Sequence, residues 1–365
     1  MIYVYQVLSD TNVGGAGRYL LNYIRHFDRR NYTVTVLIPE NSKLRPMLGM
    51  FADIRILEVP FMADKSYDKR CVKYLYELFL KEKPDIVHTH ASLSARIAAK
   101  KANVKTVIAT RHCIEGIGRF PISTVKRYLN NLLCDYYIAV SGAVKYNLRD
   151  GGIEEKKIRE ISNGVEAVKE LSDEEKKALR EKYGIGDETV FGIFARLEPV
   201  KGHKYFIKAA KQFLKEGHKG KFLIVGDGSL KEELITQAKD TPEILFTGYV
   251  KDTTELLNIT DVNVLASESE AMSLAILEAM SLGKPTIATD VGGNGQLITN
   301  GVNGWLTEYK NSQAMKEAFI KFSEDRAFYE ENAKNAEAIY LQAYTAEMMV
   351  QNLERFYEEV TNGNK

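Results

Sequence analysis

Residues 85–110 read DIVHTHASLSARIAAKKANVKTVIAT and contain one complete unit of the pattern that runs through the chain. A short run at Asp85–Thr89 is followed by a helix-like segment at Leu93–Ala102 and a second short run at Thr106–Thr110. The short runs are β-branched and do not alternate strictly with polar residues, which is typical of parallel strands covered on both faces. The stretch therefore predicts a strand–helix–strand unit of a parallel sheet.

The same rhythm extends in both directions. Around this unit we predict further strands at Ile2–Leu8, Tyr32–Ile38, Ile54–Val59 and Tyr136–Val140. The rhythm breaks in the stretch 163–187 and then restarts, with strands at Val190–Ala195, Lys221–Val225, Ile244–Phe246, Val262–Leu265 and Pro285–Ala288. This pattern predicts an α/β fold of two Rossmann-like domains facing each other across a cleft, with ligands beyond the carboxyl ends of the strands. We place the domains at 1–165 and 166–345, and expect a C-terminal helix at 346–365 to pack back on the first.

Composition limits the class of protein. The 365 residues are 45% hydrophobic and 27% charged, which is ordinary for globular domains. Three scattered cysteines argue against a disulfide framework and against a zinc site. The sequence contains no run of 18 apolar residues and its start lacks a signal-peptide pattern, so we expect a cytoplasmic protein. A net charge of only +1 and the lack of a stacking platform argue against nucleic-acid binding.

Two glycine-rich loops follow predicted strands. The first, Asn12–Gly17, contains Gly14 and Gly15 before a predicted helix, and the second spans Asp290–Gly295. Glycine lets a backbone turn tightly and approach a ligand, and a helix N-terminus offers free N–H groups that suit phosphate. A tight turn without any ligand explains either loop equally well.

Two cations follow the first strand of the second domain. Arg196 and Lys201 lie on one short loop that ends at Gly202, just before a predicted helix. A guanidinium fork and an ammonium point charge at this position suit a diphosphate. The alternative is a pair of solvated surface cations.

Two carboxylates follow a later strand. Glu270 lies in the loop after Leu265, and Glu278 lies on the helix that Ser273 is expected to cap and that runs to about Leu282. One carboxylate is placed to meet a ligand beyond the strand, and the other to reach hydroxyl groups lying along the helix. Eight-residue spacing of glutamates also arises by chance on solvated helix faces.

Taken in order, these loops resemble the retaining GT-B glycosyltransferases of family four, the group 1 glycosyl transferases. The resemblance covers almost the whole chain. It rests on Gly14-Gly15, Asp85–His90, Ala139–Ser141, Ser162–Val165, Arg196 with Lys201-Gly202, Val225–Gly228, Phe246–Val250, the Glu270–Glu278 pair, Gly292-Gly293 and Gly301–Gly304.

The resemblance implies a role for each matching position. Arg196 and Lys201 would hold the diphosphate of a nucleotide sugar, expected to be a UDP-sugar, and Glu270 would face the donor sugar, with His112 nearby. These four are the expected catalytic residues. Gly15 would approach the phosphate from the first domain, Val250 would lie beside the base, and Glu278 would bind the ribose. The full expected donor-binding set is Gly14, Gly15, Arg196, Lys201, Val250, Glu270, Ala271, Met272, Ser273, Leu274 and Glu278.

The chain departs from the family pattern at three places. Ala271-Met272-Ser273 stands where Gly-Phe-Pro/Gly is common, Ala195 replaces a common glycine, and Gly295-Gln296 replaces a frequent Pro-Glu. The first departure leaves the donor sugar open between a hexose and an N-acetylhexosamine. The expected acceptor is a saccharide or a lipid-linked molecule in polysaccharide or glycoconjugate biosynthesis. The alternatives are a GT-B sugar-nucleotide epimerase or phosphorylase and a non-catalytic nucleotide-sugar binding protein.

No metal or other cofactor is expected. The sequence contains no Asp-x-Asp motif and no His/Cys cluster with metal-ligand spacing. We expect His88 and His90 to lie on opposite sides of a strand end, as structural or substrate-lining residues.

Charge is distributed unevenly along the chain. Residues 1–160 carry 26 Lys+Arg and 16 Asp+Glu, whereas the remainder carries 24 and 33. Within 96–129 the cations Arg96, Lys100, Lys101, Lys105, Arg111, Arg119, Lys126 and Arg127 face one anion, Glu115, with Phe120, Ile122, Val125, Tyr128 and Leu129 interleaved. We expect this surface to dock on the anionic inner leaflet of a membrane, the alternative being an ordinary solvated helix face.

Overall fold

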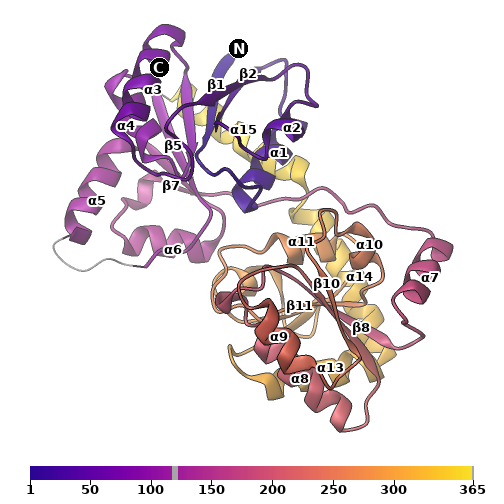
Figure 1. Cartoon of the computed structure of the whole chain (residues 1–365). Coiled ribbons are helices and arrows are strands. Elements are labelled where there is room, and N and C mark those ends of the chain that lie inside the picture. Colours follow the sequence, from indigo (N-terminus) through magenta and orange to yellow (C-terminus); the bar gives the residue numbers. More distant parts are fainter. Residues whose placement is uncertain (117–121, 364–365) are drawn as a thin grey trace. The chain divides into compact units, whose positions relative to one another are not determined.

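The computed structural model describes residues 1–116 and 122–363, with the side chains of 122–127 excluded. It divides into two compact units (Figure 1). Unit 1 consists of Met1–Gly164 together with Ala346–Lys365, and unit 2 consists of Val165–Thr345. The C-terminal segment therefore belongs to the same unit as the N-terminus.

Unit 1 is built on a seven-stranded parallel sheet with the order β3-β2-β1-β4-β5-β6-β7. Its strands are β1 Ile2–Leu8, β2 Tyr32–Pro39, β3 Arg55–Val59, β4 Ile86–His90, β5 Thr106–Arg111, β6 Tyr136–Ala139 and β7 Ile158–Glu160. The helices are α1 Gly15–His26, α2 Arg45–Leu48, α3 Lys69–Glu82, α4 Leu93–Lys101, α5 Ile122–Leu133, α6 Gly142–Asp150 and α15 Ala346–Asn362, with a 3₁₀ turn η1 at Glu155–Lys157.

Helix α15 is part of the core of unit 1. Its apolar face buries Leu353, Phe356 and Tyr357 against α1 and the sheet. The hydroxyl of Tyr32 on β2 donates a hydrogen bond to the backbone oxygen of Glu354, 3.0 Å away. Burial of apolar surface at about 25 cal/mol per Å² makes such a helix a structural element of the unit to which it packs.

Unit 2 is built on a six-stranded parallel sheet with the order β10-β9-β8-β11-β12-β13. Its strands are β8 Thr189–Phe194, β9 Gly220–Val225, β10 Ile244–Gly248, β11 Val262–Leu265, β12 Thr286–Thr289 and β13 Gly304–Thr307. The helical elements are α7 Asp173–Lys182, η2 Pro199–Lys201, α8 His203–Lys215, α9 Lys231–Ala238, α10 Thr254–Asn258, α11 Leu274–Met280, α12 Asn294–Leu297, α13 Ser312–Glu324 and α14 Arg326–Ala343.

The predicted α/β class with two Rossmann-like sheets is confirmed. Two edge strands were not predicted. β7 reads IRE and β13 reads GWLT, so neither contains an apolar, β-branched run like those that predict the other strands. β13 begins at Gly304, where only glycine fits, because a Cβ there would lie 2.3 Å from the backbone oxygen of Thr286 on β12. Helix α11 ends at Met280, earlier than predicted.

In each sheet the strand order reverses at one point, and this determines where loops gather. In unit 1 the reversal lies between β1 and β4, and in unit 2 it lies between β8 and β11. Loops on the carboxyl side of such a point diverge and leave a crevice in which ligands of parallel sheets bind.

Candidate active site

Lys201 and Glu270 meet at the reversal point of unit 2. Lys201 ends the turn η2 after β8, and Glu270 lies in the loop after β11. The Lys201 ammonium donates to Glu270 Oε1 across 2.6 Å, with 21% and 11% of the two side chains exposed. Half-buried ion pairs are screened less by solvent than exposed ones. The geometry therefore places one cation and one carboxylate at a ligand-binding edge of the sheet.

The two loops are held together by backbone contacts. Glu268 N donates to Val200 O at 2.8 Å, which ties the loop after β11 to the turn after β8. Gly202 has φ +68°, and a Cβ there would lie 2.0 Å from the backbone oxygen of Ala266. Only glycine permits both this left-handed conformation and this close approach. Gly202 therefore sets the distance between the loops that carry Lys201 and Glu270.

Arg196 lies on the same loop as Lys201 but is exposed. The loop is anchored beside it, because Leu197 N donates to Asp227 O at 3.0 Å and Glu198 accepts hydrogen bonds from Ser229. These hydrogen bonds lower the pKa of the Glu198 carboxyl, with a smaller contribution from the Arg196 charge. Arg196 forms no ion pair within the part of the chain that the structure describes. Its guanidinium is available to a ligand.

The segment between the two glutamates is partly buried. Met272 and Ser273 are buried, and Ala271 and Leu274 are half-buried. Ser273 occupies the N-cap position of α11 as predicted, but its side chain makes no capping hydrogen bond, which corrects the expected capping role. Glu278 is half-buried in the middle of α11.

Val250 follows β10 and packs against a small apolar cluster of unit 2. Its neighbour Tyr249 is 74% exposed. The structure thus leaves Val250 half-buried at the carboxyl side of the sheet, which is the edge that also carries Lys201. This placement is compatible with a surface for a flat ring.

In unit 1, Gly14 and Gly15 lie at the start of α1, at the end of the loop that follows β1. Gly14 is the N-cap residue, and a Cβ there would meet only an oxygen of Asp10, at 3.8 Å. The protein itself therefore does not require glycine at 14. A Cβ at Gly17 would meet Leu44 at 3.1 Å, so Gly17 serves packing. Packing within the protein therefore explains the glycine at position 17 but not the glycine at position 14, although both stand in one motif.

His112 follows β5 and belongs to a buried hydrogen-bonded cluster. His112 Nε2 lies 2.9 Å from His90 Nδ1, and His90 Nε2 lies 3.1 Å from Gln6 Oε1. Burial lowers the pKa of His88 and of His112 to about 3, and that of His90 well below its ordinary value. All three imidazoles are therefore neutral near pH 7.

The expected placement of His88 and His90 on opposite sides of the strand end is wrong. Their ring centroids lie 4.7 Å apart, on the same face of the sheet. Side chains on a strand alternate with a period of two, so residues i and i+2 share a face. Gln6 and Tyr357, which were not predicted, complete the cluster. A lone glutamine inside the apolar strand Ile2–Leu8 was the available signal.

The prediction that Arg96 belongs to a basic surface at 96–129 is wrong. Arg96 is only 9% exposed and donates to Asn130 Oδ1 at 3.2 Å and to the Tyr137 hydroxyl at 3.0 Å. Ion pairs join Lys100 to Asp135, Lys105 to Asp85 and Arg111 to Glu115. The side chains of Arg119, Phe120, Ile122, Val125, Lys126 and Arg127 lie outside the described residues.

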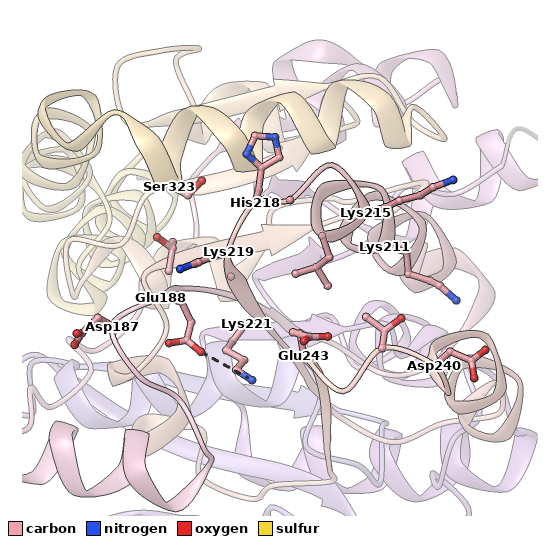
Figure 2. A pocket seen from close by; sticks show the side chains of 15 residues that line it. Asp187, Glu188, Lys211, Lys215, His218, Lys219, Lys221, Asp240, Glu243 and Ser323 are labelled. Atoms are coloured by element: carbon pink, nitrogen blue, oxygen red, sulfur yellow. Dashed lines mark ion pairs between the residues drawn. The ribbon is translucent and has the colours of Figure 1, made fainter.

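A hollow of about 1010 Å³ lies elsewhere on unit 2 (Figure 2). Its lining mixes both charges, with Lys221 and Glu188 paired at 3.9 Å. Thr189 and Gly220, which begin β8 and β9, line this hollow, so it lies at the amino ends of the strands. Parallel sheets bind ligands at the opposite edge. We therefore place the candidate site at Lys201 and Glu270 and not here.

Two further observations concern the described residues as a whole. No helix among them is long and apolar enough to cross a membrane. Nor does this part of the chain bring three or more His, Cys, Asp or Glu side chains together in a group suited to a metal ion.

Two parallel sheets with charged and glycine-rich loops at their reversal points define a nucleotide-binding α/β enzyme. Comparison with known proteins narrows this class. The pattern of the glycosyl transferases group 1 matches residues 175–339, and that of Glycosyltransferase Family 4 matches residues 13–169. The UDP-Gal:alpha-D-GlcNAc-diphosphoundecaprenol alpha-1,3-galactosyltransferase of Escherichia coli is 32% identical over 338 residues, which cover 86% of each chain.

A second relative is the capsular polysaccharide biosynthesis glycosyltransferase CapM of Staphylococcus aureus, 23% identical over 92% of each chain. Among solved structures, the Anabaena protein HepE in complex with UDP and glucose superposes with a TM-score of 0.85 at 22% identity, covering 98% of this chain and all of that one. The chain belongs to the group 1 glycosyltransferases of the GT-B fold, and it is a glycosyltransferase.

Proposed function

We propose that the chain transfers a hexose or an N-acetylhexosamine from a UDP-sugar to a saccharide or lipid-linked acceptor, with retention at the anomeric carbon. The Escherichia coli relative is named for a UDP-Gal donor and a diphosphoundecaprenol-linked acceptor, which supports this choice. The HepE structures contain UDP and glucose or UDP-glucose. Polysaccharide or glycolipid assembly is the corresponding role.

The observation that carries the proposal is the Lys201–Glu270 pair of 2.6 Å at the reversal point of unit 2. In glycosyl transfer the bond between the anomeric carbon and the diphosphate oxygen breaks, and its electron pair goes to the diphosphate. Lys201 and Arg196 are proposed to neutralise that charge, in the way that preorganised cations stabilise a leaving group. The acceptor oxygen bonds to the anomeric carbon, and its proton passes to the leaving phosphate. Glu270, paired with Lys201, is proposed to face the sugar.

The remaining donor contacts follow from the same placement. Glu278 on α11 is proposed to bind the ribose hydroxyls, and Val250 to lie beside the base. Residues 271–274 are proposed to contact sugar hydroxyls and phosphate, and Gly14 and Gly15 of unit 1 to approach the phosphate. His112 is proposed to lie near the sugar. With two cations at the diphosphate, we propose that transfer needs no divalent metal.

A panel of nucleotide sugars tests the donor. A ligand at 100 times its dissociation constant adds about 2.7 kcal/mol of stability. We expect one UDP-sugar to raise the melting temperature in EDTA, and UDP to be released when an acceptor is supplied. Release of UDP without a new glycoside would indicate a different reaction. No shift with any donor would contradict the proposal.

We further propose that the surface around α5 meets an anionic membrane that holds the acceptor. The observation that favours this is an exposed apolar group on α5: Tyr128 is 68%, Leu129 43% and Leu132 56% exposed. Exposed Lys101 on the preceding helix adds charge. Sedimentation with anionic and neutral vesicles tests the idea. We expect binding to anionic vesicles that weakens in Leu132→Ser, whereas equal binding to both vesicles or to neither would contradict it.

A further inference from the structure

A chain of hydrogen-bonded neutral side chains runs through the interior of unit 1 from α15 to His112. Gln6 Nε2 donates to the Tyr357 hydroxyl at 2.9 Å, and Gln6 Oε1 lies 3.1 Å from His90 Nε2. His90 Nδ1 then lies 2.9 Å from His112 Nε2. Gln6, His90 and Tyr357 have no exposed surface, so water cannot replace any of these contacts.

The amide of Gln6 assigns a direction to the whole chain. Its oxygen can only accept, so His90 Nε2 must carry the proton that it shares with Gln6. A neutral imidazole has one N–H, which leaves His90 Nδ1 as an acceptor. His112 Nε2 must therefore carry a proton and donate it to His90.

The other nitrogen of His112 is then left with a lone pair. His112 Nδ1 makes no hydrogen bond to any described residue, and His112 is half-buried. Its lone pair is of the kind that accepts a hydrogen bond from a hydroxyl group. The aromatic ring of Tyr19 packs on both His90 and His112, with centroids 5.4 and 5.1 Å away, which fixes the ring planes.

We propose that Gln6 is a positioning residue for glycosyl transfer, because through His90 it holds His112 in the tautomer whose Nδ1 accepts a hydrogen bond from a sugar hydroxyl. This inference rests on the proposed function, in which His112 lies near the sugar. Gln6 itself touches no substrate. Its effect is on which nitrogen of His112 carries the proton.

Tyr357 bonds to the NH₂ group of the Gln6 amide. Its hydroxyl accepts from Gln6 Nε2 and lies 2.5 Å from His88 Nδ1, while His88 Nε2 lies 2.6 Å from Thr110 Oγ1. A flipped amide would present its NH₂ group to His90 and reverse every proton in the chain. The C-terminal helix thus contributes one hydroxyl to the row of hydrogen bonds that ends at His112.

The first test is spectroscopic and needs no substrate. In histidine-¹⁵N-labelled protein, long-range ¹H–¹⁵N spectra distinguish a protonated from a bare ring nitrogen, and His112→Asn identifies the signals of His112. We expect a protonated Nε2 and a bare Nδ1 in the native protein. In Gln6→Met the acceptor for His90 Nε2 is gone, and a buried N–H without a partner is costly. We therefore expect the proton of His90 to move to Nδ1 and His112 to show the inverted tautomer.

The second test is kinetic. An inverted His112 presents an N–H to a hydroxyl that should donate, and the loss of one hydrogen bond corresponds to about a tenfold fall in kcat. We expect this fall in Gln6→Met, with the donor KM changed less than about twofold. Tyr357→Phe should give a mixture of tautomers and an intermediate kcat.

Tyr32→Phe is the matched control. Tyr32 also bonds to α15, through the backbone oxygen of Glu354, and its ring lies 6.1 Å from that of Tyr357. It does not take part in the row of hydrogen bonds from Tyr357 to His112. We expect Tyr32→Phe to keep both the His112 tautomer and kcat. The control therefore distinguishes a general loosening of α15 from a change in these hydrogen bonds.

The outcomes are distinct. A native tautomer in Gln6→Met would overturn the chain, and an inverted tautomer with unchanged kcat would overturn the positioning role. A fall in kcat equal in Tyr32→Phe and Tyr357→Phe would also overturn it. If the native protein transfers sugar from no donor, the proposed function fails and the positioning role fails with it, while the tautomer spectra still decide whether the chain exists.

Discussion

The two units place different chemistry at the same point of the same kind of sheet. At its reversal point unit 2 presents charge, with Lys201 and Glu270 paired at 2.6 Å and Arg196 exposed nearby. Unit 1 presents neutral rings, with His112 bonded to His90 in a buried cluster. The net charges of the two sequence regions do not predict this difference, because residues 1–160 are basic and the remainder is acidic. The net charge of a domain therefore says little about the charge of its site, which depends on a few loop residues.

The largest expected effect follows from removing the cation of unit 2. Lys201→Ala leaves the developing diphosphate charge without its nearest partner, and we expect kcat to fall by about 10²–10³. Steady-state kinetics measure this. Lys208→Ala is the matched control, because Lys208 is an exposed lysine of the adjacent helix α8, and it should stay near the native rate. Equal rates in both variants would contradict the role of Lys201.

The next effect concerns the geometry that brings Lys201 to Glu270. Gly202→Ala places a methyl group 2.0 Å from the backbone oxygen of Ala266 at φ +68°, so we expect a loss of more than about 2 kcal/mol of unfolding free energy. Gly184→Ala is the control. Gly184 has φ +64°, but nothing lies within 4 Å of its Cβ position, so only the conformational cost of about 1–2 kcal/mol remains. Urea unfolding of both variants measures the two losses of unfolding free energy. Their difference is the cost of the contact with Ala266, and equal losses would show that this contact costs nothing.

The features of the two units that can be predicted from the sequence are those whose residues lie close together along it. The loop with Arg196 and Lys201 and the segment from Glu270 to Glu278 each lie within ten residues, directly after a strand, so their edge of the sheet follows from strand order. The strands themselves follow from apolar runs, except for β7 and β13, whose sequences IRE and GWLT contain no such run.

The parts that sequence could not predict are contacts between distant residues. Gln6, His90 and Tyr357 come together only after the sheet forms and α15 packs on it. Arg96 was expected on the surface because its local pattern is basic, yet Asn130 and Tyr137 satisfy its guanidinium in the interior. A local pattern carries no information on such partners. This is why the sequence predicts that Lys201 and Glu270 share one edge of the sheet, whereas it does not predict the cluster in unit 1.

The two units are also expected to differ in how much stability they lose in acid, although the loss per histidine is smaller than the effects above. Folding lowers the pKa of His88 and His112 to about 3 and that of His90 well below its ordinary value, whereas unit 2 has one such histidine, His203, with a pKa of about 4. The unfolded chain binds these protons near pH 6.5, so the stability that neutral histidines provide is complete above that value and is lost as pH falls towards about 3 to 4.

The loss is at most about 1.4 kcal/mol per pH unit for each histidine. We therefore expect unit 1 to lose stability faster than unit 2 when the pH is lowered from 6.5 to 5.5. Hydrogen–deuterium exchange of peptides from β4 and β5, compared with peptides from β8 and β11, measures the two units separately. Equal acid sensitivity of the two sets would contradict this difference.

The smallest effect tests whether charge contributes to unit 1 away from its site. Arg159 on β7 forms an ion pair with Glu359 on α15, but the two side chains are 52% and 49% exposed. Exposed pairs contribute at most about 1 kcal/mol, so Arg159→Ala should cost less than that and the cost should shrink in high salt. Leu353→Ala on the buried face of the same helix should cost about 2–5 kcal/mol, because it leaves a cavity in the core. Urea unfolding at low and high salt measures both. A larger loss in Arg159→Ala than in Leu353→Ala would mean that charge, and not burial, holds α15 on unit 1.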